Sequence, residues 1–493
     1  VCAPLDWDGS GSCQPFQSFS TLSIQYIDYL SPTNPFRILL TQKVDASHST
    51  QVMRFYNGAG MLIQTHTLNA ELDDQTANLV NESRYDGFGR QILQTVPYTY
   101  TGSPALQNPA APRTGSSTWY DPLGRPAIST LPNGNQTETT YNQLTTSVTD
   151  PRGYATTYTR DVWGRLTAVE APEGPGLSYS YDRGGNLLSV TKGSGSAATT
   201  TSMEYDLAGR KTAMNDADMG AWSYEYDALA NLTYQEDARG CGIEITYDVL
   251  NRPTGKQYTS ACPQTDPVSY LYDGESFTFL GSQYGGGSHT AGRRTAMLDG
   301  SGATLWVYDA RGRATQETRL IFSDAQKTQA QTFVTSQAFN SADLPVSYSY
   351  PDTSAPAETL TYTYNPQLLL TSLQNDQAQP FVYVNAASYD ASGRLTALEL
   401  GNSGGSPLVT RAYSYHPWAY PTEGGNLASL VSFNAANVQL QNFTYAYDAN
   451  SNITQILDGV NSEQADFGYD TLNRLTSATY DGASDLEELF TYE

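Results

Sequence analysis

Aromatic and polar side chains alternate along most of this chain with a period of two residues. Tyr179-Ser180-Tyr181 and Tyr445-Ala446-Tyr447 are examples. A period of two places successive tyrosine rings on the same face of a strand. The alternating stretches are short, about six residues, and each ends in a cluster of Asp, Gly and Asn, which favours tight turns. The pattern predicts an all-β protein built from many short strands and hairpins.

One string recurs where these strands end: an aromatic residue, any residue, Tyr-Asp, two or three small residues, Gly or Asn, Arg or Asn, and then Leu-Thr. Asp opens a turn by accepting hydrogen bonds from backbone amides one or two residues further on. Gly or Asn three residues later tolerates the left-handed conformation that closes a hairpin loop. The clear copies, which we interpret as a structural turn motif, are Tyr85-Asp86-Gly87-Phe88-Gly89-Arg90, Tyr120-Asp121-Pro122-Leu123-Gly124-Arg125, Tyr205-Asp206-Leu207-Ala208-Gly209-Arg210, Tyr247-Asp248-Val249-Leu250-Asn251-Arg252, Tyr308-Asp309-Ala310-Arg311-Gly312-Arg313, Tyr389-Asp390-Ala391-Ser392-Gly393-Arg394 and Tyr469-Asp470-Thr471-Leu472-Asn473-Arg474. Weaker copies lie at 56–57, 160–161, 181–182, 226–227, 272–273, 364–365 and 447–448.

A second turn signal lies halfway between consecutive copies. Asp227 and Asp248 are 21 residues apart, and the turn 237–240 begins 10 residues after the first of them. The same half-step separates Asp150-Pro151-Arg152-Gly153 from Asp161. One repeat is therefore two strands of about six residues with two tight turns, and strands so close in sequence pair antiparallel.

Roughly forty such strands in series form one long antiparallel meander, but an open twisted sheet rarely exceeds about ten strands without curling or splitting. We expect the meander of hairpins to wind into a spiral, hollow β-shell or barrel, each turn packing edge-on against the next, which removes unpaired edges. The alternative is a row of ordinary β-sandwiches, but no linker rich in Pro and Gly divides the chain into domains.

The repeat pattern is not uniform along the chain. Residues 1–51 hold no good copy and are expected to form a less regular N-terminal β segment, followed by a repeat array over 52–493. Insertions or degenerate repeats are expected near 274–298, 314–345 and 395–440. The chain starts at Val1 without a leader pattern and stops at Glu493 in mid-repeat, so we expect it to be the processed or partial form of a longer protein.

Composition explains part of this pattern and excludes several functions. Of 493 residues, 36 are Tyr and 41 are Gly, and only 15% are charged. About 25% is usual. The apolar content is also below the usual range, which fits a thin wall better than a thick dry core. A net charge of −24 argues against nucleic acid and anionic membrane surfaces as partners. No run of 18 apolar residues predicts a membrane span.

The Tyr-Asp copies resemble the YD-repeat, or Rhs, family over roughly residues 52–493. Its members include bacterial Rhs polymorphic toxins, the B–C cocoon of insecticidal toxin complexes, and the YD shell of animal teneurins. The resemblance implies a hollow β-shell that encloses a C-terminal toxin segment or linker, and no enzymatic role for the Tyr and Asp of the motif. Bacterial members usually end the shell with a self-cleaving Asp-Pro-x-Gly segment and a variable toxin. Neither follows the last repeat here, so a cargo activity is expected to lie outside this chain.

The four cysteines form two local pairs that are candidates for disulfides, Cys2 with Cys13 and Cys241 with Cys262. A hairpin centred on Asn251 places Cys241 opposite about residue 259, within reach of Cys262. Disulfides indicate a secreted or cell-surface location. The alternative is four unrelated small core residues.

The sequence predicts no catalytic, cofactor-binding or metal site, and we expect a protein that is not an enzyme. The histidines at 48, 66, 289 and 416 are scattered singly and are interpreted as surface or turn residues. Carboxylates are abundant, but their spacing is explained by turns. Residues 215–220 weakly resemble a calcium loop without its downstream Glu, and a half-step turn is the better interpretation. Five Asn-x-Ser/Thr sequons are no more than chance predicts.

Two functions remain open. The first is a secreted or surface shell, without enzymatic activity, that encapsulates and helps deliver a toxin lying outside this chain. Its partners would be its own C-terminal cargo or adjacent repeats of the same polypeptide. The alternative is an extracellular structural or adhesive protein, such as a surface fibre, a sheath or a matrix component, in contact with cell-surface glycans or proteins. Tyr rings beside Asp and Asn suit sugar stacking, but the same rings suit cross-strand packing, which is the favoured interpretation.

Overall fold

The computed structural model describes residues 22–27, 35–44, 49–72, 75–108, 112–263, 265–351, 358–377, 381–402, 406–481 and 486–491. It contains forty β-strands and, in the described part of the chain, one short 3₁₀ helix, η1 (Gly195–Ala197), as the only helix. The first half of the chain forms β1 (Leu22–Ile27), β2 (Arg37–Lys43), β3 (Ser49–Tyr56), β4 (Leu62–Leu72), β5 (Gln75–Tyr85), β6 (Gln91–Thr95), β7 (Tyr98–Tyr100), β8 (Gly115–Tyr120), β9 (Pro126–Thr130), β10 (Gln136–Asn142), β11 (Thr145–Thr149), β12 (Ala155–Arg160), β13 (Leu166–Glu170), β14 (Leu177–Tyr181), β15 (Leu187–Lys192), β16 (Thr199–Tyr205), β17 (Lys211–Asp216), β18 (Gly220–Tyr226), β19 (Leu232–Glu236) and β20 (Gly242–Tyr247). The second half forms β21 (Pro253–Tyr258), β22 (Val268–Tyr272), β23 (Phe277–Phe279), β24 (Ser282–Tyr284), β25 (Arg294–Asp299), β26 (Gly302–Tyr308), β27 (Ala314–Phe322), β28 (Ala330–Phe339), β29 (Pro345–Ser349), β30 (Thr359–Tyr364), β31 (Leu370–Asn375), β32 (Val382–Tyr389), β33 (Leu395–Leu400), β34 (Val409–Tyr415), β35 (Leu427–Asn434), β36 (Gln439–Tyr447), β37 (Ile453–Asp458), β38 (Glu463–Tyr469), β39 (Leu475–Asp481) and β40 (Leu486–Leu489).

Thirty-eight of these strands form one continuous antiparallel sheet. Neighbours in the chain are neighbours in the sheet, apart from β7, which pairs with β5, and the separate hairpin β23–β24. The predicted all-β fold and long antiparallel meander are therefore confirmed. Among the described residues β1 pairs only with β2, and β40 only with β39, so the two end strands do not pair with each other.

Because consecutive strands are antiparallel neighbours, alternate hairpins lie on opposite edges of this ribbon. Every Tyr-Asp copy falls on one edge, which we call the YD edge. The intermediate turns fall on the other, which we call the half-step edge. The turns of the YD edge begin at residues 57, 86, 121, 142, 161, 182, 206, 227, 248, 273, 309, 340, 365, 390, 416, 448 and 470, and those of the half-step edge include 131–135, 150–153, 171–176, 217–219, 237–240 and 459–462.

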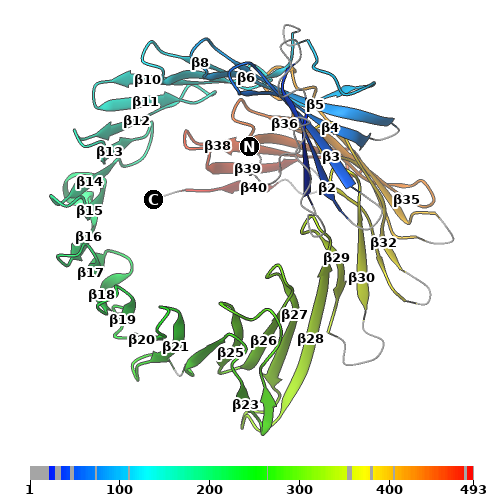
Figure 1. Cartoon of the computed structure of the whole chain (residues 1–493). Coiled ribbons are helices and arrows are strands. Elements are labelled where there is room, and N and C mark those ends of the chain that lie inside the picture. The colour runs from blue at the N-terminus through cyan, green and yellow to red at the C-terminus, as the bar shows by residue number, and fades with distance from the viewer. Residues whose placement is uncertain are drawn as a thin grey trace, which may run out of the picture.

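The ribbon follows a ring-shaped path and then returns beside its own beginning (Figure 1). From β12 to β38 the path contains 25 strands, leaving out β23 and β24. At about 4.8 Å per strand this path is roughly 120 Å long, which gives a ring roughly 38 Å across. Side chains occupy about 5 Å on the inner face, half the distance between stacked sheets. They leave roughly 28 Å open, so the predicted hollow spiral follows from strand number alone.

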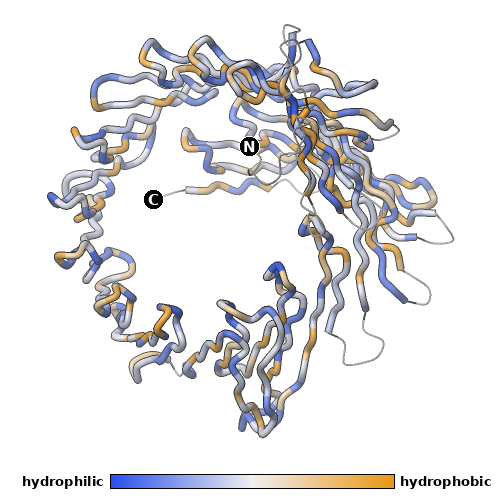
Figure 2. Tube along the Cα trace, in the orientation of Figure 1, coloured by the Kyte–Doolittle hydropathy of each residue, from blue (hydrophilic) through white to orange (hydrophobic). Residues whose placement is uncertain are grey.

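The wall is one sheet thick over most of its length, and few side chains are fully buried. Hydrophobic and hydrophilic residues alternate along the ribbon instead of gathering in one layer (Figure 2). The described residues contain two buried apolar clusters: Met53, Phe55 and Leu68 in the N-terminal strands, and Phe279, Ala303 and Leu320 beneath the β23–β24 hairpin. The low apolar content of the sequence is therefore explained by a wall that is one sheet thick and has little buried core.

The segments expected to interrupt the repeat have distinct structures. Segment 274–298 contains the hairpin β23–β24 and most of β25. Segments 314–345 and 395–440 supply strands β27 to β29 and β33 to β36 of the main sheet. Within residues 1–51, β1 and β2 pair with each other, and β2 pairs with β3 in the same sheet.

The structure joins Cys241 to Cys262 in a disulfide, with 4.4 Å between their Cα atoms. This bridge closes the open end of the β20–β21 hairpin, as the sequence predicts. Cys2 and Cys13 lie outside the described residues. A search of the described residues for a helix long and apolar enough to cross a bilayer finds none.

Candidate functional site

The Tyr-Asp turns are held by a clasp between the aspartate and the residue four positions later. In the copy at Asp206, carboxylate Oδ1 accepts hydrogen bonds from the backbone N–H groups of Ala208 and Arg210, both at 2.9 Å. Oδ2 accepts one from Arg210 Nε at 2.6 Å. Gly209 has a φ of 78°, in the left-handed region. The motif is thus a turn whose backbone donors are satisfied by its own aspartate.

The other copies repeat this geometry with two variations. Arginine closes the clasp in the complete copies and at Arg165, and asparagine does so at Asn186, Asn231 and Asn452. The left-handed position is occupied by residues other than Gly or Asn in several turns, including Ala230, Leu368 and Ser451. Backbone and side-chain hydrogen bonds from Arg210 hold the pKa of Asp206 below its ordinary value, and those from Asn231 do the same for Asp227. The carboxylates are therefore stabilised as anions.

Each clasp also contacts the next one along the YD edge. The guanidinium of Arg210 stacks on the ring of Tyr226 at 5.1 Å, and its Nη1 donates to the carbonyl oxygen of Asp227 at 2.7 Å. The Tyr226 hydroxyl donates to the carbonyl oxygen of Lys211 at 2.9 Å. The same tyrosine-to-carbonyl bond recurs at tyrosines 85, 120, 141, 181, 247, 272, 308, 364, 389, 415, 447 and 469. The sequence indicates the turn but not this link between repeats. The link depends on which tyrosine of the next hairpin lies beside each arginine.

Replacing Tyr447 by phenylalanine should lower the free energy of unfolding by about 1 kcal/mol, because it removes one partly buried hydrogen bond. Tyr447 donates to the carbonyl oxygen of Leu427 at 2.9 Å, and burial raises the pKa of Tyr447 to about 12. Tyr445→Phe is the matched control, two residues away on the same face, and should change stability by less than about 0.5 kcal/mol. Chemical denaturation of the two variants measures the difference. Equal losses would show that the carbonyl bond contributes nothing.

The spiral is closed where the half-step edge of the first turn meets the YD edge of the last. We call this contact the seam. Hydrogen bonds across it join residues 287 to 321 positions apart in the sequence. The contacts include Asn133 and Asn135 donating to the carbonyl oxygen of Thr422, both at 2.9 Å, and Gln367 donating to that of Glu71 at 2.8 Å. The predicted edge-on packing of successive turns is therefore present.

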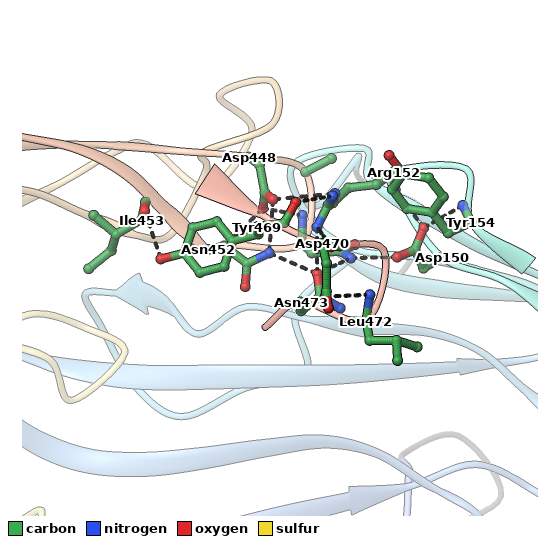
Figure 3. A network of polar contacts seen from close by, with 12 residues as sticks. Asp150, Arg152, Tyr154, Asp448, Asn452, Ile453, Tyr469, Asp470, Leu472 and Asn473 are labelled. Carbon is green, nitrogen blue, oxygen red and sulfur yellow. Dashed lines mark hydrogen bonds and ion pairs between the residues drawn. The ribbon is translucent and has the colours of Figure 1, made fainter. Parts of the chain in front are cut away.

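Arg152 is the centre of the densest part of the seam (Figure 3). It extends from the half-step turn 150–153, and its Nη1 donates to the carbonyl oxygen of Asp470 and to Asn473 Oδ1, both at 3.0 Å. Its Nε lies 3.5 Å from Asp448 Oδ2, and the Arg152 side chain is only 14% exposed. Asn450 Nδ2 donates to Asp150 Oδ2 at 2.6 Å. Arg152 thus contacts two Tyr-Asp turns, those at Asp448 and Asp470, which lie about three hundred residues later in the sequence.

Within the part of the chain that the structure describes, the remaining candidate residues do not gather into a second site. The described residues hold no group of three or more His, Cys, Asp or Glu side chains placed to bind a metal ion. Residues 217–219 form the half-step turn between β17 and β18, and Asp216 accepts backbone hydrogen bonds there. His289 and His416 lie in turns, and His48 lies outside the described residues. The interpretation of His66 as a surface or turn residue is wrong: it lies in β4 and is fully buried, because long-range packing decided its position.

Family models match the first two fifths of the chain. Residues 30–151 match a domain of unknown function, DUF6443, and residues 142–175 and 164–197 match the RHS repeat. No curated protein sequence matches. The geometry above defines a class: an all-β shell built from tandem Tyr-Asp hairpins and closed by a seam.

Solved structures with the same fold are toxin-complex assemblies. A crystal structure of TcdB2-TccC3 superimposes with a TM-score of 0.76 at 17% identity, covering 93% of this chain and 25% of that one. A Tc holotoxin pore of Photorhabdus luminescens gives 0.75 at 17% identity, covering 91% and 24%. TcdB2-TccC3 without its hypervariable C-terminal region gives 0.74 at 16% identity, covering 91% and 24%. The chain spans about a quarter of these chains. The chain therefore contains RHS repeats over residues 142–197 and has the same fold as these toxin-complex structures.

Proposed function

We propose that this chain is the wall of a container that encloses a polypeptide cargo and helps to deliver it, without catalysing a reaction itself. The observation that carries the proposal is the seam, because it converts a long open ribbon into a wall around a central space. That space is roughly 28 Å across, whereas an α-helix with its side chains is about 10–12 Å across. A polypeptide chain or a pair of helices therefore fits inside.

The chemistry of the wall supports a passive role. Its strand faces carry exposed hydroxyl and carboxylate side chains, such as those of Ser202, Glu204 and Glu225. The net charge of −24 attracts basic segments. The similar assemblies named above include a Tc holotoxin and one whose hypervariable C-terminal region can be removed. These features favour a toxin cargo and, with the Cys241–Cys262 disulfide, an extracellular destination.

Protease protection tests this proposal. A flexible, basic segment with a protease site is fused after Glu493, because β40 lies within the outline of the ring in the view of Figure 1. We expect cleavage at least 100-fold slower than in the free segment. The matched control carries the same segment in the exposed turn 206–209 and should be cut rapidly. Equal cleavage at both positions would refute encapsulation, and regular polymers seen by electron microscopy would favour the structural or adhesive role.

A further inference from the structure

A row of large apolar side chains stands on the YD edge of the first turn of the spiral, and the turn motif does not require it. The row occupies the two tip positions after each aspartate, or after Asn142, where the turn itself uses only a backbone N–H. The clasp arginines Arg90 and Arg165 also stack on the rings of Phe88 and Trp163, at 5.1 and 4.9 Å. Seven of the eight consecutive turns from 86 to 251 carry such a residue, and all are exposed, from 46% at Leu144 to 109% at Leu207. The side chains are Phe88, Leu123, Leu144, Val162, Trp163, Leu207, Leu229, Val249 and Leu250, which we call the apolar rim.

The same positions are different where the YD edge is covered by the seam. Four of the five turns that make seam contacts carry Ser341 and Ala342, Pro366 and Gln367, Ala449 and Asn450, and Thr471 and Leu472 at their tips. The fifth, the longer turn 416–426, carries Trp418 and Tyr420. Leu472 is the one large aliphatic residue in this set, and it is 38% exposed. In these four turns, the tips that pack against the ribbon at the seam are therefore small or polar, apart from Leu472. Between residues 86 and 251 the open edge carries large apolar tips, whereas the exposed turn 57–60 carries Gly58 and Ala59. An exposed apolar row of this size marks an interaction surface.

We propose that the apolar rim is the interface of a two-fold dimer, in which the rim of one copy faces the rim of a second copy. The order of tip residues is self-complementary about its midpoint. A two-fold axis between the turns 161–164 and 182–185 places Phe88 opposite Leu250 of the second copy, Leu123 opposite Leu229, and Leu144 opposite Leu207. It also places Trp163 opposite Arg183, the one charged tip in the row, in a cation–π pair.

Area and charge both favour a second copy as the occupant. Burying an aliphatic or aromatic side chain removes roughly 60–120 Å² from water, so nine of them cover roughly 500–1,100 Å² per copy, and stable interfaces need about 800 Å². Five of the seven aspartates along the rim are paired with their own arginines. The rim is therefore nearly neutral in a chain of net charge −24, and two acidic copies repel each other least there. This interface is independent of what the shell encloses.

Analytical ultracentrifugation of the 493-residue chain over a range of concentrations tests the proposal. We expect a monomer–dimer equilibrium whose dissociation constant rises at least 100-fold in the variant Trp163→Ser/Leu207→Ser/Leu229→Ser. These residues are exposed, and their side chains are not part of the clasp hydrogen bonds, although the Trp163 ring stacks on the guanidinium of Arg165 at 4.9 Å. The fold should therefore be retained, as circular dichroism can check. The control Val307→Ser/Ile321→Ser/Leu457→Ser changes three strand residues that are 39–40% exposed, and it should dimerise normally.

Cross-linking distinguishes the two-fold arrangement from others. In a Cys2→Ser/Cys13→Ser background, copies carrying Leu123→Cys should be joined by a short bis-maleimide to copies carrying Leu229→Cys. They should not be joined to other Leu123→Cys copies, which the axis keeps five turns apart, roughly 48 Å along the wall at two strands per turn and roughly 36 Å in a straight line across a ring of this size. A monomer at every concentration, a dimer unaffected by the triple variant, or Leu123–Leu123 links would overturn the proposal. Flotation of the monomer with phosphatidylcholine vesicles would instead assign the rim to lipid.

Discussion

Replacing Arg152 by alanine is expected to open the seam and to lower the free energy of its opening by about 3 kcal/mol. The guanidinium makes hydrogen bonds to a carbonyl and to a side-chain oxygen of the last turn and lies near the Asp448 carboxylate. Charged hydrogen bonds of this kind contribute about 1.5–3 kcal/mol each and are not additive. Removing one partner of a largely buried ion pair also leaves the other without compensation.

Amide hydrogen exchange measures this opening directly. Amides of residues 448–473 should exchange about 100-fold faster in Arg152→Ala, because 1.4 kcal/mol corresponds to a factor of ten. Protease sites in the same segment should become accessible, while residues 199–258, further along the ring from the seam, should keep their protection (Figure 1). Such a pattern would show that the seam opens as a unit.

Arg239 provides a matched control within the same chain. The strings Asp150-Pro151-Arg152-Gly153 and Asp237-Ala238-Arg239-Gly240 have the same spacing and both form half-step turns. Arg239 pairs only with its own Asp237 and is 76% exposed. Its replacement by alanine should change stability by less than about 1 kcal/mol. Equal effects of the two substitutions would mean that the seam does not depend on Arg152.

This pair of arginines shows how far the sequence predicts the structure. The turn, the antiparallel pairing and the wound meander follow from local signals: an aspartate that satisfies nearby amides, a residue that accepts positive φ, and a period of two. The identity of the seam residues does not follow. Arg152 and Arg239 have equivalent local strings, and only the circumference of the ring decides which of them meets Asp470.

Other features of the structure could not be predicted from the sequence for the same reason. Leu368 and Ala230 occupy left-handed positions where the pattern favours Gly or Asn, because the clasp and the adjoining strands fix the turn around them. The stacking of Arg210 on Tyr226 depends on the distance between adjacent hairpins. The buried position of His66 depends on the ring of Phe55 and on the loop at Gln107, whose backbone N–H holds Gln64 beside the imidazole. Local chemistry predicts the repeat, and long-range packing decides what each repeat contacts.

Acidification is expected to destabilise the N-terminal strands by about 3 kcal/mol between pH 6.5 and pH 4. His66 is fully buried, with its ring 4.7 Å from that of Phe55. Burial lowers the pKa of His66 from 6.5 to about 4. Above pH 6.5 the imidazole is neutral in both the folded and the unfolded chain. Below it the unfolded chain binds a proton that the folded chain does not, so stability falls until the pH reaches about 4.

The surroundings of His66 offer the imidazolium little compensation. His66 Nε2 lies 3.1 Å from Gln64 Oε1, which also accepts a hydrogen bond from the Gln107 amide at 2.8 Å. The buried Glu82 carboxylate accepts from Arg84 Nε at 2.5 Å and from Gln64 Nε2 at 3.4 Å. The nearest anion is thus already neutralised by an arginine. Protonation of His66 therefore favours opening of β3, β4 and β5, which carry the seam contacts at Thr50 and Glu71.

Thermal unfolding followed from pH 7 to pH 4 should show this loss, and His66→Gln should abolish most of it. Glutamine is neutral throughout this range and can still donate toward Gln64, although the smaller side chain should lower stability at pH 7 as well. The informative quantity is therefore the slope with pH, not the absolute midpoint. His289→Gln is the control, because that residue is exposed and should leave the slope unchanged. Clasp aspartates with a lowered pKa, such as Asp206 and Asp227, contribute a separate loss below pH 3.8. A chain whose stability is flat between pH 6.5 and pH 4, or a His66→Gln variant with the parent's slope, would show that another group controls the response to acid.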